Sequence, residues 1–172
     1  MEFYIAQGIS ILASIVAILL MQINNMKKIL IAQITLNLLV ASTYFLLNKF
    51  SGVGISLIAI IQLIVMFGYN KKEKKPHNFV VGLFILAYAC YSLFTFKSFI
   101  DLFPLIAAIL FALGAAQVNP ATFRTFGMLN PLFWLVYDIY TLAIVNAIMR
   151  VGIFTSAVIS KVRLDGFLKN KQ

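Results

Sequence analysis

Seven long apolar stretches, separated by short polar segments, run through the chain. They cover roughly residues 3–23, 29–47, 53–69, 79–96, 102–118, 126–147 and 148–164. Each has about the 17–25 residues that a helix needs to cross ~30 Å of hydrocarbon. The pattern therefore predicts an all-α integral membrane protein with seven transmembrane helices.

The boundary between the last two stretches follows only from the length of the apolar run that contains both. From Phe126 to Val162 the apolar character is interrupted only at Asn146 and Arg150. One helix of that length would overshoot a bilayer, so a break is needed. We expect it near Asn146–Arg150.

An internal repeat explains the odd number of spans. When the chain is shifted by 98 residues against itself, the segment 48–71 matches 146–169 at eight of 24 positions, and the 74-residue overlap has twelve identities. The first three spans then align with the last three. Because three is an odd number, a linking span must carry the chain back, so the two triples run parallel. We predict a first three-helix repeat at 1–72, a basic loop and linker helix at 73–98, and a second repeat at 99–172.

Composition and charge agree with a membrane protein and indicate its orientation. The chain is 62% apolar and 11% charged, far from the balance of soluble domains. With seven spans and the N-terminus outside, eleven of the fourteen basic residues fall on the cytoplasmic side; the outer side receives only Lys49, Lys97 and Arg150. This asymmetry predicts a cytoplasmic C-terminus. The basic residues cluster at span ends, so we expect the lipid bilayer as partner and no nucleic acid.

Two stripes of polar and aromatic residues lie at helical spacing inside apolar spans. The second span carries Gln33, Asn37, Tyr44 and Asn48. The sixth span carries Asn130, Trp134, Tyr137 and Thr141, with Asp138 at the edge of the stripe. A helix facing lipid gains nothing from such a face, so the stripes either line a solute path or hold helices together by hydrogen bonds.

The sixth span also contains the one acidic residue that lies deep in a span, Asp138. A carboxylate at mid-bilayer costs about 2.5–3.5 kcal/mol, so it usually faces a cavity or a partner. Both a role in solute or proton handling and a structural ion pair are open for it.

Two Asn-Pro pairs suggest breaks in membrane helices. Pro131 removes one helical N–H, so we expect the sixth span to kink or restart there with Asn130 as cap. Asn119-Pro120 is expected to end the fifth span. We therefore regard Pro120 and Pro131 as hinges, because broken helices often mark transport sites.

Signatures of catalysis and of bound cofactors are lacking. The sequence contains neither a nucleophile–base arrangement, nor a P-loop, nor metal-ligand spacing. We expect no enzyme, no cofactor and no metal, and the oligomeric state, including a homo-oligomer, stays open.

Several motifs resemble a known family. The opening YIAQGISI (4–11), the segment YFLLNKFSGVGIS (44–56) and the basic run after the third span are similar to the small YgjV-type bacterial inner-membrane proteins. This resemblance implies location in the bacterial inner, cytoplasmic membrane and assigns no activity.

The 3+1+3 plan also resembles the SWEET, PQ-loop and nicotinamide riboside transporter superfamily. That likeness implies alternating access, with proline-containing helices as hinges and a central site of asparagine and aromatic residues. The chain departs from it in two ways: Asn-Pro stands where Pro-Gln would be expected, and Trp134 is a lone tryptophan.

We therefore predict a transporter for a small polar solute such as a sugar, a vitamin or a nucleoside-like molecule. Its expected solute contacts are Gln33, Asn37, Tyr44, Asn130, Trp134, Tyr137, Asp138 and Thr141. The alternative is a non-transporting subunit or scaffold that binds another membrane protein or a lipid.

Overall fold

The computed structural model describes residues 2–47, 50–140 and 144–166, and this part of the chain forms seven α-helices. A 3₁₀ turn, Phe99–Asp101, leads into α5, and a π-helical turn, Lys161–Asp165, follows α7. The α-helices are α1 (Glu2–Leu20), α2 (Met26–Leu46), α3 (Phe50–Lys71), α4 (Asn78–Thr95), α5 (Leu102–Ala115), α6 (Pro120–Tyr140) and α7 (Ile144–Ser160).

Local sequence signals account for several of the helix starts. Asn25 caps α2 by accepting a hydrogen bond from the Lys28 amide at 3.2 Å. His77 caps α4 by accepting from the Phe79 amide at 3.3 Å. Such caps satisfy amides that have no partner inside the helix. The polar residues between the apolar stretches therefore begin helices as well as interrupting them.

Four of the seven helices are long and apolar enough to cross a membrane. They are α1 to α4, over Phe3–Leu20, Met26–Leu46, Gly52–Lys71 and Asn78–Thr95. The segment Phe99–Ala115, which includes α5, is a shorter apolar helix. The all-helical class predicted from the sequence is confirmed, whereas spanning by α5, α6 and α7 stays a prediction.

Two predicted helix boundaries are wrong. Asn146 and Arg150 lie inside α7, which begins at Ile144, so the helix break expected at these two residues does not occur there. Asn119-Pro120 does not end the fifth helix, which stops at Ala115; it begins α6 instead. The Asn119 side chain accepts a hydrogen bond from the Ala121 amide at 2.9 Å, and a proline is favoured at a first helical position because its missing N–H is not needed there.

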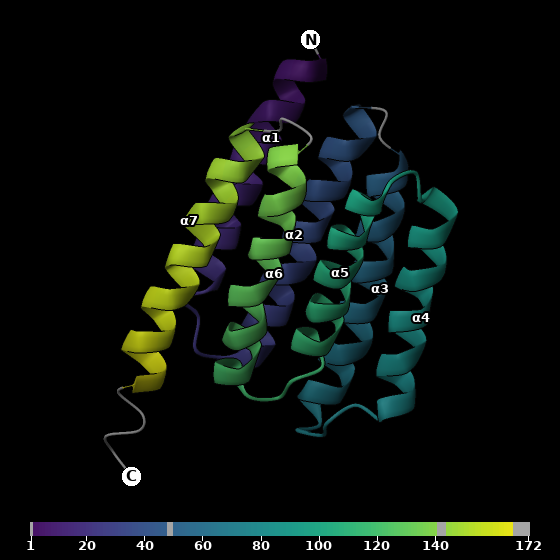
Figure 1. Cartoon of the computed structure of the whole chain (residues 1–172). Helices are drawn as coiled ribbons and strands as arrows, with labels where there is room; N and C mark the ends of the chain where they lie inside the picture. Colours follow the sequence, from purple (N-terminus) through teal and green to yellow (C-terminus); the bar gives the residue numbers. More distant parts are fainter. Residues whose placement is uncertain (1, 48–49, 141–143, 167–172) are drawn as a thin grey trace.

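The helices alternate in direction along the bundle, as Figure 1 shows. The two triples α1–α3 and α5–α7 both begin at the same end, and α4 leads from one triple to the other. This is the order of directions that two parallel triples with one linking helix require. The repeat relation and the division at 72 and 98 remain predictions.

Six of the helices form a closed ring, with α4 attached to its outside. The middle helix of each triple packs against both of its neighbours, α2 against α1 and α3, and α6 against α5 and α7. The ring closes where α1 contacts α7 and where α3 contacts α5, and α4 packs against α3 and α5 (Figure 1). Side chains from both triples consequently face a common centre.

One end of the bundle is rich in basic residues, and we call it the basic end. Here α1, α3, α5 and α7 end and the intervening helices begin (Figure 1). The basic side chains near these helix ends are Lys27, Lys28, Lys71, Lys72, Lys74, Lys75, Arg124, Lys161 and Arg163. The structure thus gathers on one end the charges that the sequence assigns to one side of the membrane.

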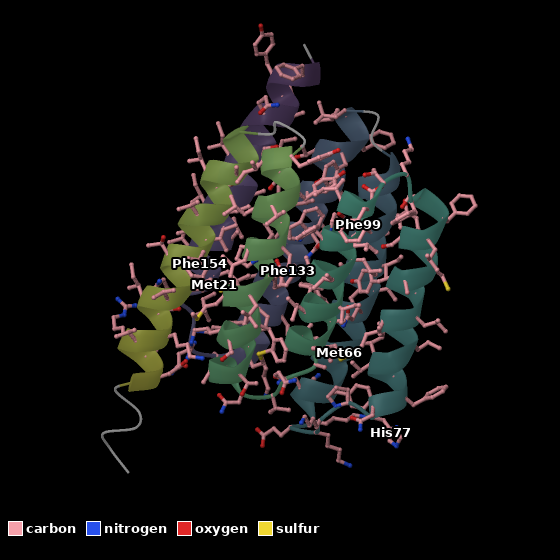
Figure 2. All side chains as sticks on the ribbon, viewed as in Figure 1. Met21, Met66, His77, Phe99, Phe133 and Phe154 are labelled. Atoms are coloured by element: carbon pink, nitrogen blue, oxygen red, sulfur yellow. The ribbon has the colours of Figure 1, made fainter. Side chains whose placement is uncertain are left out.

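A tightly packed apolar cluster fills the half of the bundle near the basic end. Met21 and Met66, both labelled in Figure 2, belong to it together with Leu20, Ile29 and Phe123, and all five are at most 6% exposed. Outward faces instead carry exposed large apolar residues such as Leu19, Leu38, Ile64, Leu86 and Phe94. An apolar exterior of this extent fits a lipid environment.

Candidate functional site

A cavity of about 330 Å³ lies inside the ring of helices, and all seven helices contribute to its wall. This volume lies within the usual range of small-molecule sites, about 300–1,000 Å³. The wall is mostly apolar and carries a limited set of polar groups. They are Gln7, Ser10, Ser14, Gln33, Asn37, Thr43, Tyr44, Ser56, Tyr88, Asn130, Trp134, Asn146 and Arg150.

Five of the predicted site residues line this cavity. Gln33, Asn37 and Tyr44 come from α2, and Asn130 and Trp134 come from α6. The two helical stripes, which are about 100 residues apart in the sequence, thus face the same space from the two triples. Their contact with a solute stays a prediction.

The other three predicted site residues are not on the cavity wall as described. Tyr137 packs edge to face against Trp134, with ring centroids 6.0 Å apart. Asp138 is 4% exposed and is bound by Arg150. Thr141 lies outside the described residues, as does Asn48 of the other stripe.

Gln33 and Ser56 are buried polar residues whose side chains have no hydrogen-bond partner among the described contacts. They are 6% and 3% exposed, and both line the cavity. In the described part of the chain, every fully buried side-chain nitrogen or oxygen atom has a hydrogen-bond partner. The polar atoms of these two side chains have none, so they cannot be fully buried and must border accessible space. A buried polar group is costly unless something binds it, so these two groups are ready to bind water or a ligand.

Asn37 and Asn130 are held in place by backbone bonds. The Asn37 amide nitrogen donates to the Gln33 carbonyl at 2.9 Å, one helical turn back. The Asn130 amide nitrogen donates to the Ala107 carbonyl of α5 at 2.7 Å. The expectation that Asn130 caps a restarted helix is wrong, because α6 continues from Pro120 to Tyr140 and Asn130 ties it to α5 instead.

Pro131 lies inside α6 without ending it. A proline has no N–H, so the Gly127 carbonyl one turn earlier lacks its usual helical donor. Both Gly127 and Pro131 line the cavity. The proline therefore leaves a backbone acceptor beside the cavity, and its role as a hinge stays a prediction.

Arg150 is the charged residue that the sequence analysis did not assign to the site. Its Nε donates to Asp138 Oδ2 at 3.1 Å, and its guanidinium carbon lies 5.0 Å from the centroid of the Trp134 ring. Arginine over an aromatic face is favourable, because the ring face is electronegative. An available signal was Asp138 itself, since an acid deep in a span needs a partner and Arg150 is the nearest basic residue along the chain.

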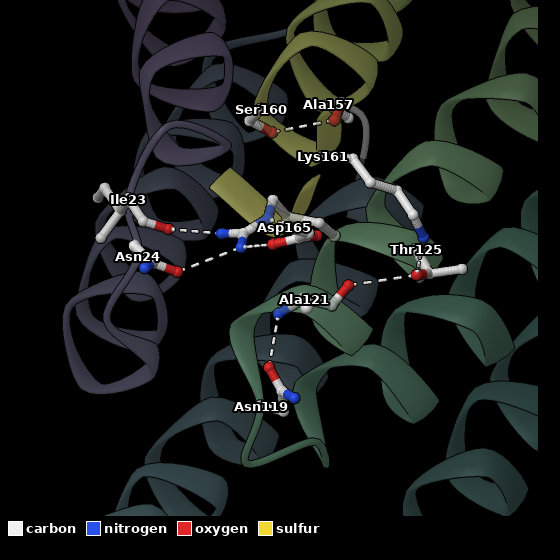
Figure 3. A network of polar contacts seen from close by, with 10 residues as sticks. Ile23, Asn24, Asn119, Ala121, Thr125, Ala157, Ser160, Lys161 and Asp165 are labelled. Carbon is white, nitrogen blue, oxygen red and sulfur yellow. Dashed lines mark hydrogen bonds and ion pairs between the residues drawn. The ribbon is translucent and has the colours of Figure 1, made fainter. Parts of the chain in front are cut away.

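Beyond the cavity, the basic end is closed by a polar network around Arg124. This side chain is fully buried and forms an ion pair with Asp165 (Figure 3). It also donates to the Ile23 carbonyl at 3.1 Å and to Asn24 Oδ1 at 3.2 Å. Lys161 donates to Thr125 in the same region. The network joins the α1–α2 junction, the start of α6 and the turn after α7.

A second set of bonds joins α1 to α7 next to this network. Gln22 Nε2 donates to Ser156 Oγ at 2.9 Å, and Ser156 Oγ donates to the Ile18 carbonyl at 2.8 Å. Arg163 donates to Gln22 Oε1 at 2.8 Å. Together with the apolar cluster, these contacts hold the helices closely packed at the basic end, whereas Asn146, a cavity-lining residue near the opposite end, is exposed.

Comparison with known families identifies the chain at the level of a family. Residues 4–166 match Imp-YgjV, a family described as bacterial inner membrane protein. The chain belongs to this family. The resemblance inferred from YIAQGISI and YFLLNKFSGVGIS is thereby confirmed, and with it the bacterial inner membrane as location. Comparison with curated proteins and with solved structures found no match. For this Imp-YgjV member, the site described above is therefore the basis for a functional proposal.

Proposed function

We propose that this Imp-YgjV protein is a transporter that moves a small polar solute through the centre of its helix ring by alternating access. The observation that carries the proposal is the cavity of about 330 Å³ with the unpartnered side chains of Gln33 and Ser56 on its wall. Gln33 and Ser56 belong to buried residues, yet their polar atoms border the cavity and are open to a hydrogen-bonding ligand. A solute that hydrogen-bonds to them supplies the missing partners.

Polar groups from both triples support a path between them. Gln33, Asn37 and Tyr44 approach the cavity from the first triple, and Asn130 and Trp134 approach it from the second. In transporters with parallel repeats the two halves rock against each other. If the triples do so here, each triple carries its own solute contacts as it moves. The solute classes that we consider are sugars, vitamins and nucleoside-like molecules.

The close packing and the polar network at the basic end support an outward-facing state in this proposal. Positive charges favour the cytoplasmic side of a bacterial inner membrane, so the basic end and the C-terminus lie in the cytoplasm and the N-terminus lies outside. The cavity then opens to the outer side, and the Arg124–Asp165 ion pair is the cytoplasmic gate. Release of the solute inward requires this pair to separate.

A thermal-shift screen of the purified protein tests the proposal. A ligand that binds only the folded state raises its apparent stability. We expect at least one small polar solute to stabilise the wild type but not Gln33→Leu. Gln117→Leu is the matched control, because Gln117 does not line the cavity and donates to the Leu113 carbonyl near the end of α5.

Uptake into reconstituted vesicles completes the test. The solute that stabilises the protein should accumulate in vesicles with wild type and with Gln117→Leu, and should not with Gln33→Leu. Binding without uptake would favour the alternative of a scaffold or subunit with a structural ligand. Neither binding nor uptake across sugars, nucleosides, vitamins and amino acids would overturn the transporter proposal.

A further inference from the structure

We propose that the solute carries an acidic group, a carboxylate or a phosphate, and that Arg150 binds this group. The inference rests on the proposed function and adds the charge class of the solute to it. It follows from four features of the cavity: its charge, the free donors of Arg150, the position of Asp138, and the polar groups farther along the wall.

Arg150 is the charged member of the cavity wall among the described residues. Its side chain is 25% exposed and comes from α7, one of the six helices of the ring. The remaining polar wall residues are amides, hydroxyls and one indole, none of which carries a formal charge at neutral pH. A solute that enters the cavity therefore meets a cation and no carboxylate on the wall.

The hydrogen-bonding capacity of Arg150 is only partly used. Its Nε donates to Asp138, and the described contacts show no hydrogen bond from its Nη groups. Arginine presents its donors in a rigid planar fork that matches the oxygens of a carboxylate or a phosphate. Trp134, 5.0 Å from the guanidinium carbon, further restricts the fork by offering it an aromatic face.

Asp138 pairs with the Arg150 guanidinium but does not line the cavity. Its side chain is 5% exposed, against 25% for Arg150. The pair is formally neutral, yet its positive member borders the cavity and its negative member is screened from it by burial. Asp138 is thus a positioning residue for Arg150. A cationic solute would encounter the guanidinium first, and like charges in a low-dielectric site repel strongly.

The rest of the wall fits an uncharged polar remainder of the solute. Gln33 and Ser56 offer partners that no protein group uses, and Gly127 has a carbonyl freed by Pro131. These groups can bind hydroxyls or amides. The volume of about 330 Å³ restricts the solute to a small molecule. A hydroxylated organic acid or a phosphorylated small metabolite combines both features.

A matched series on one sugar skeleton tests the charge class directly. The probes are glucose, glucuronate, glucose 6-phosphate and glucosamine, measured by thermal shift and titration calorimetry on the intact wild-type protein in detergent. We expect glucuronate or glucose 6-phosphate to bind at least about tenfold more tightly than glucose, and glucosamine to bind most weakly, because a hydrogen-bonded charge pair contributes about 1.5–3 kcal/mol. The two acidic probes distinguish a carboxylate from a phosphate.

Three variants connect the charge preference to Arg150. In Arg150→Gln the acidic probe should lose about tenfold or more in affinity, while glucose affinity stays unchanged. Arg150→Lys should recover part of the loss, since it keeps the charge but not the planar fork. Lys97→Gln is the matched control, because Lys97 is an exposed basic residue that does not line the cavity; it should behave as wild type.

The wild-type series decides the inference even if an Arg150 variant fails to fold. Equal or tighter binding of glucose or glucosamine overturns the acidic class. If that binding depends on Gln33 and uptake persists, the proposed transport stands while the inference falls. Acid binding that is unaffected by Arg150→Gln removes Arg150 from the site. Absence of binding by every probe, together with absence of uptake, overturns both.

Discussion

The helix pairs α2–α3 and α6–α7 occupy corresponding places in the two triples, yet their basic ends are held differently. In α6–α7, Arg124 is fully buried and pairs with Asp165, which is 15% exposed. In α2–α3, Lys27 and Glu73 lie 4.0 Å apart with side chains 44% and 84% exposed. Water and salt screen the second pair, so it contributes about 0–1 kcal/mol, whereas separating a buried pair costs several times more. The comparison teaches that the second triple carries the firm closure of this end.

The opposite ends of the two pairs differ as well. Gly52 and Arg150 are equivalent under the 98-residue offset. The Tyr44 ring lies so close to Gly52 that an added Cβ would be 2.5 Å from its Cδ2 atom. At the equivalent place, Arg150 pairs with Asp138 next to the cavity. One triple therefore supplies an uncharged, tightly packed wall, and the other supplies the charged group.

Loss of the buried ion pair should have the largest effect. We expect Arg124→Gln to lower the free energy of unfolding by about 3–5 kcal/mol, because it leaves Asp165 and the Ile23 carbonyl without their partner. Chemical unfolding in detergent or lipid, followed by circular dichroism, measures this loss. A change below about 1 kcal/mol would contradict the contrast between the two basic ends.

Gln62 should rank next. Its amide donates to the Ala112 carbonyl at 3.1 Å and accepts from the Tyr88 hydroxyl at 3.1 Å, so it joins α3, α4 and α5. Gln62→Leu should cost about 1–3 kcal/mol, since interhelical hydrogen bonds in membranes average about 0.6 and reach about 1.7 kcal/mol each.

The equivalent residue in the second triple provides the control. Among the described contacts, the Ser160 hydroxyl donates to the Ala157 carbonyl of its own helix and to no other helix, so Ser160→Ala should cost about 0.5 kcal/mol or less. Equal losses for both variants in the same unfolding experiment would show that the cross-helix bonds of Gln62 do not stabilise the fold.

Two glycine substitutions compare how tightly the triples pack. Gly52→Ala places a methyl group 2.5–2.8 Å from atoms of the Tyr44 ring and should cost about 1–3 kcal/mol through overpacking. Gly152→Ala meets Ile18 Cδ1 at 3.4 Å, which is an ordinary contact, and should change stability by about 0.5 kcal/mol or less. Melting temperatures of the two proteins in one detergent measure the difference, and a reversed order would refute it.

The exposed pair should have the smallest effect. We expect Lys27→Gln to change the free energy of unfolding by about 0–1 kcal/mol, with the larger value only at low salt. Unfolding at low and high ionic strength tests this. A loss as large as that of Arg124→Gln would mean that exposure does not distinguish the two pairs.

The class, the helices and much of the cavity wall follow from the pattern of apolar and polar residues along the chain. Long apolar stretches produce membrane helices whatever their neighbours are, because buried backbone groups in lipid must bond within the segment. Residues at helical spacing share one face, so the stripes at Gln33, Asn37 and Tyr44, and at Asn130 and Trp134, indicated correctly which faces turn inward. The family resemblance could also be seen without the structure, because it rests on short sequence motifs.

Which side chains meet across the bundle depends on how the helices pack. The contacts of Arg150 with Asp138 and of Arg124 with Asp165 join separate helices or turns, and periodicity within one helix carries no information on such neighbours. Ser56 lines the cavity although it belongs to neither of the two polar stripes seen in the sequence. The start of α7 at Ile144 was predicted wrongly for a related reason: the apolar run continues through this position, so hydropathy alone does not mark where the last helix begins.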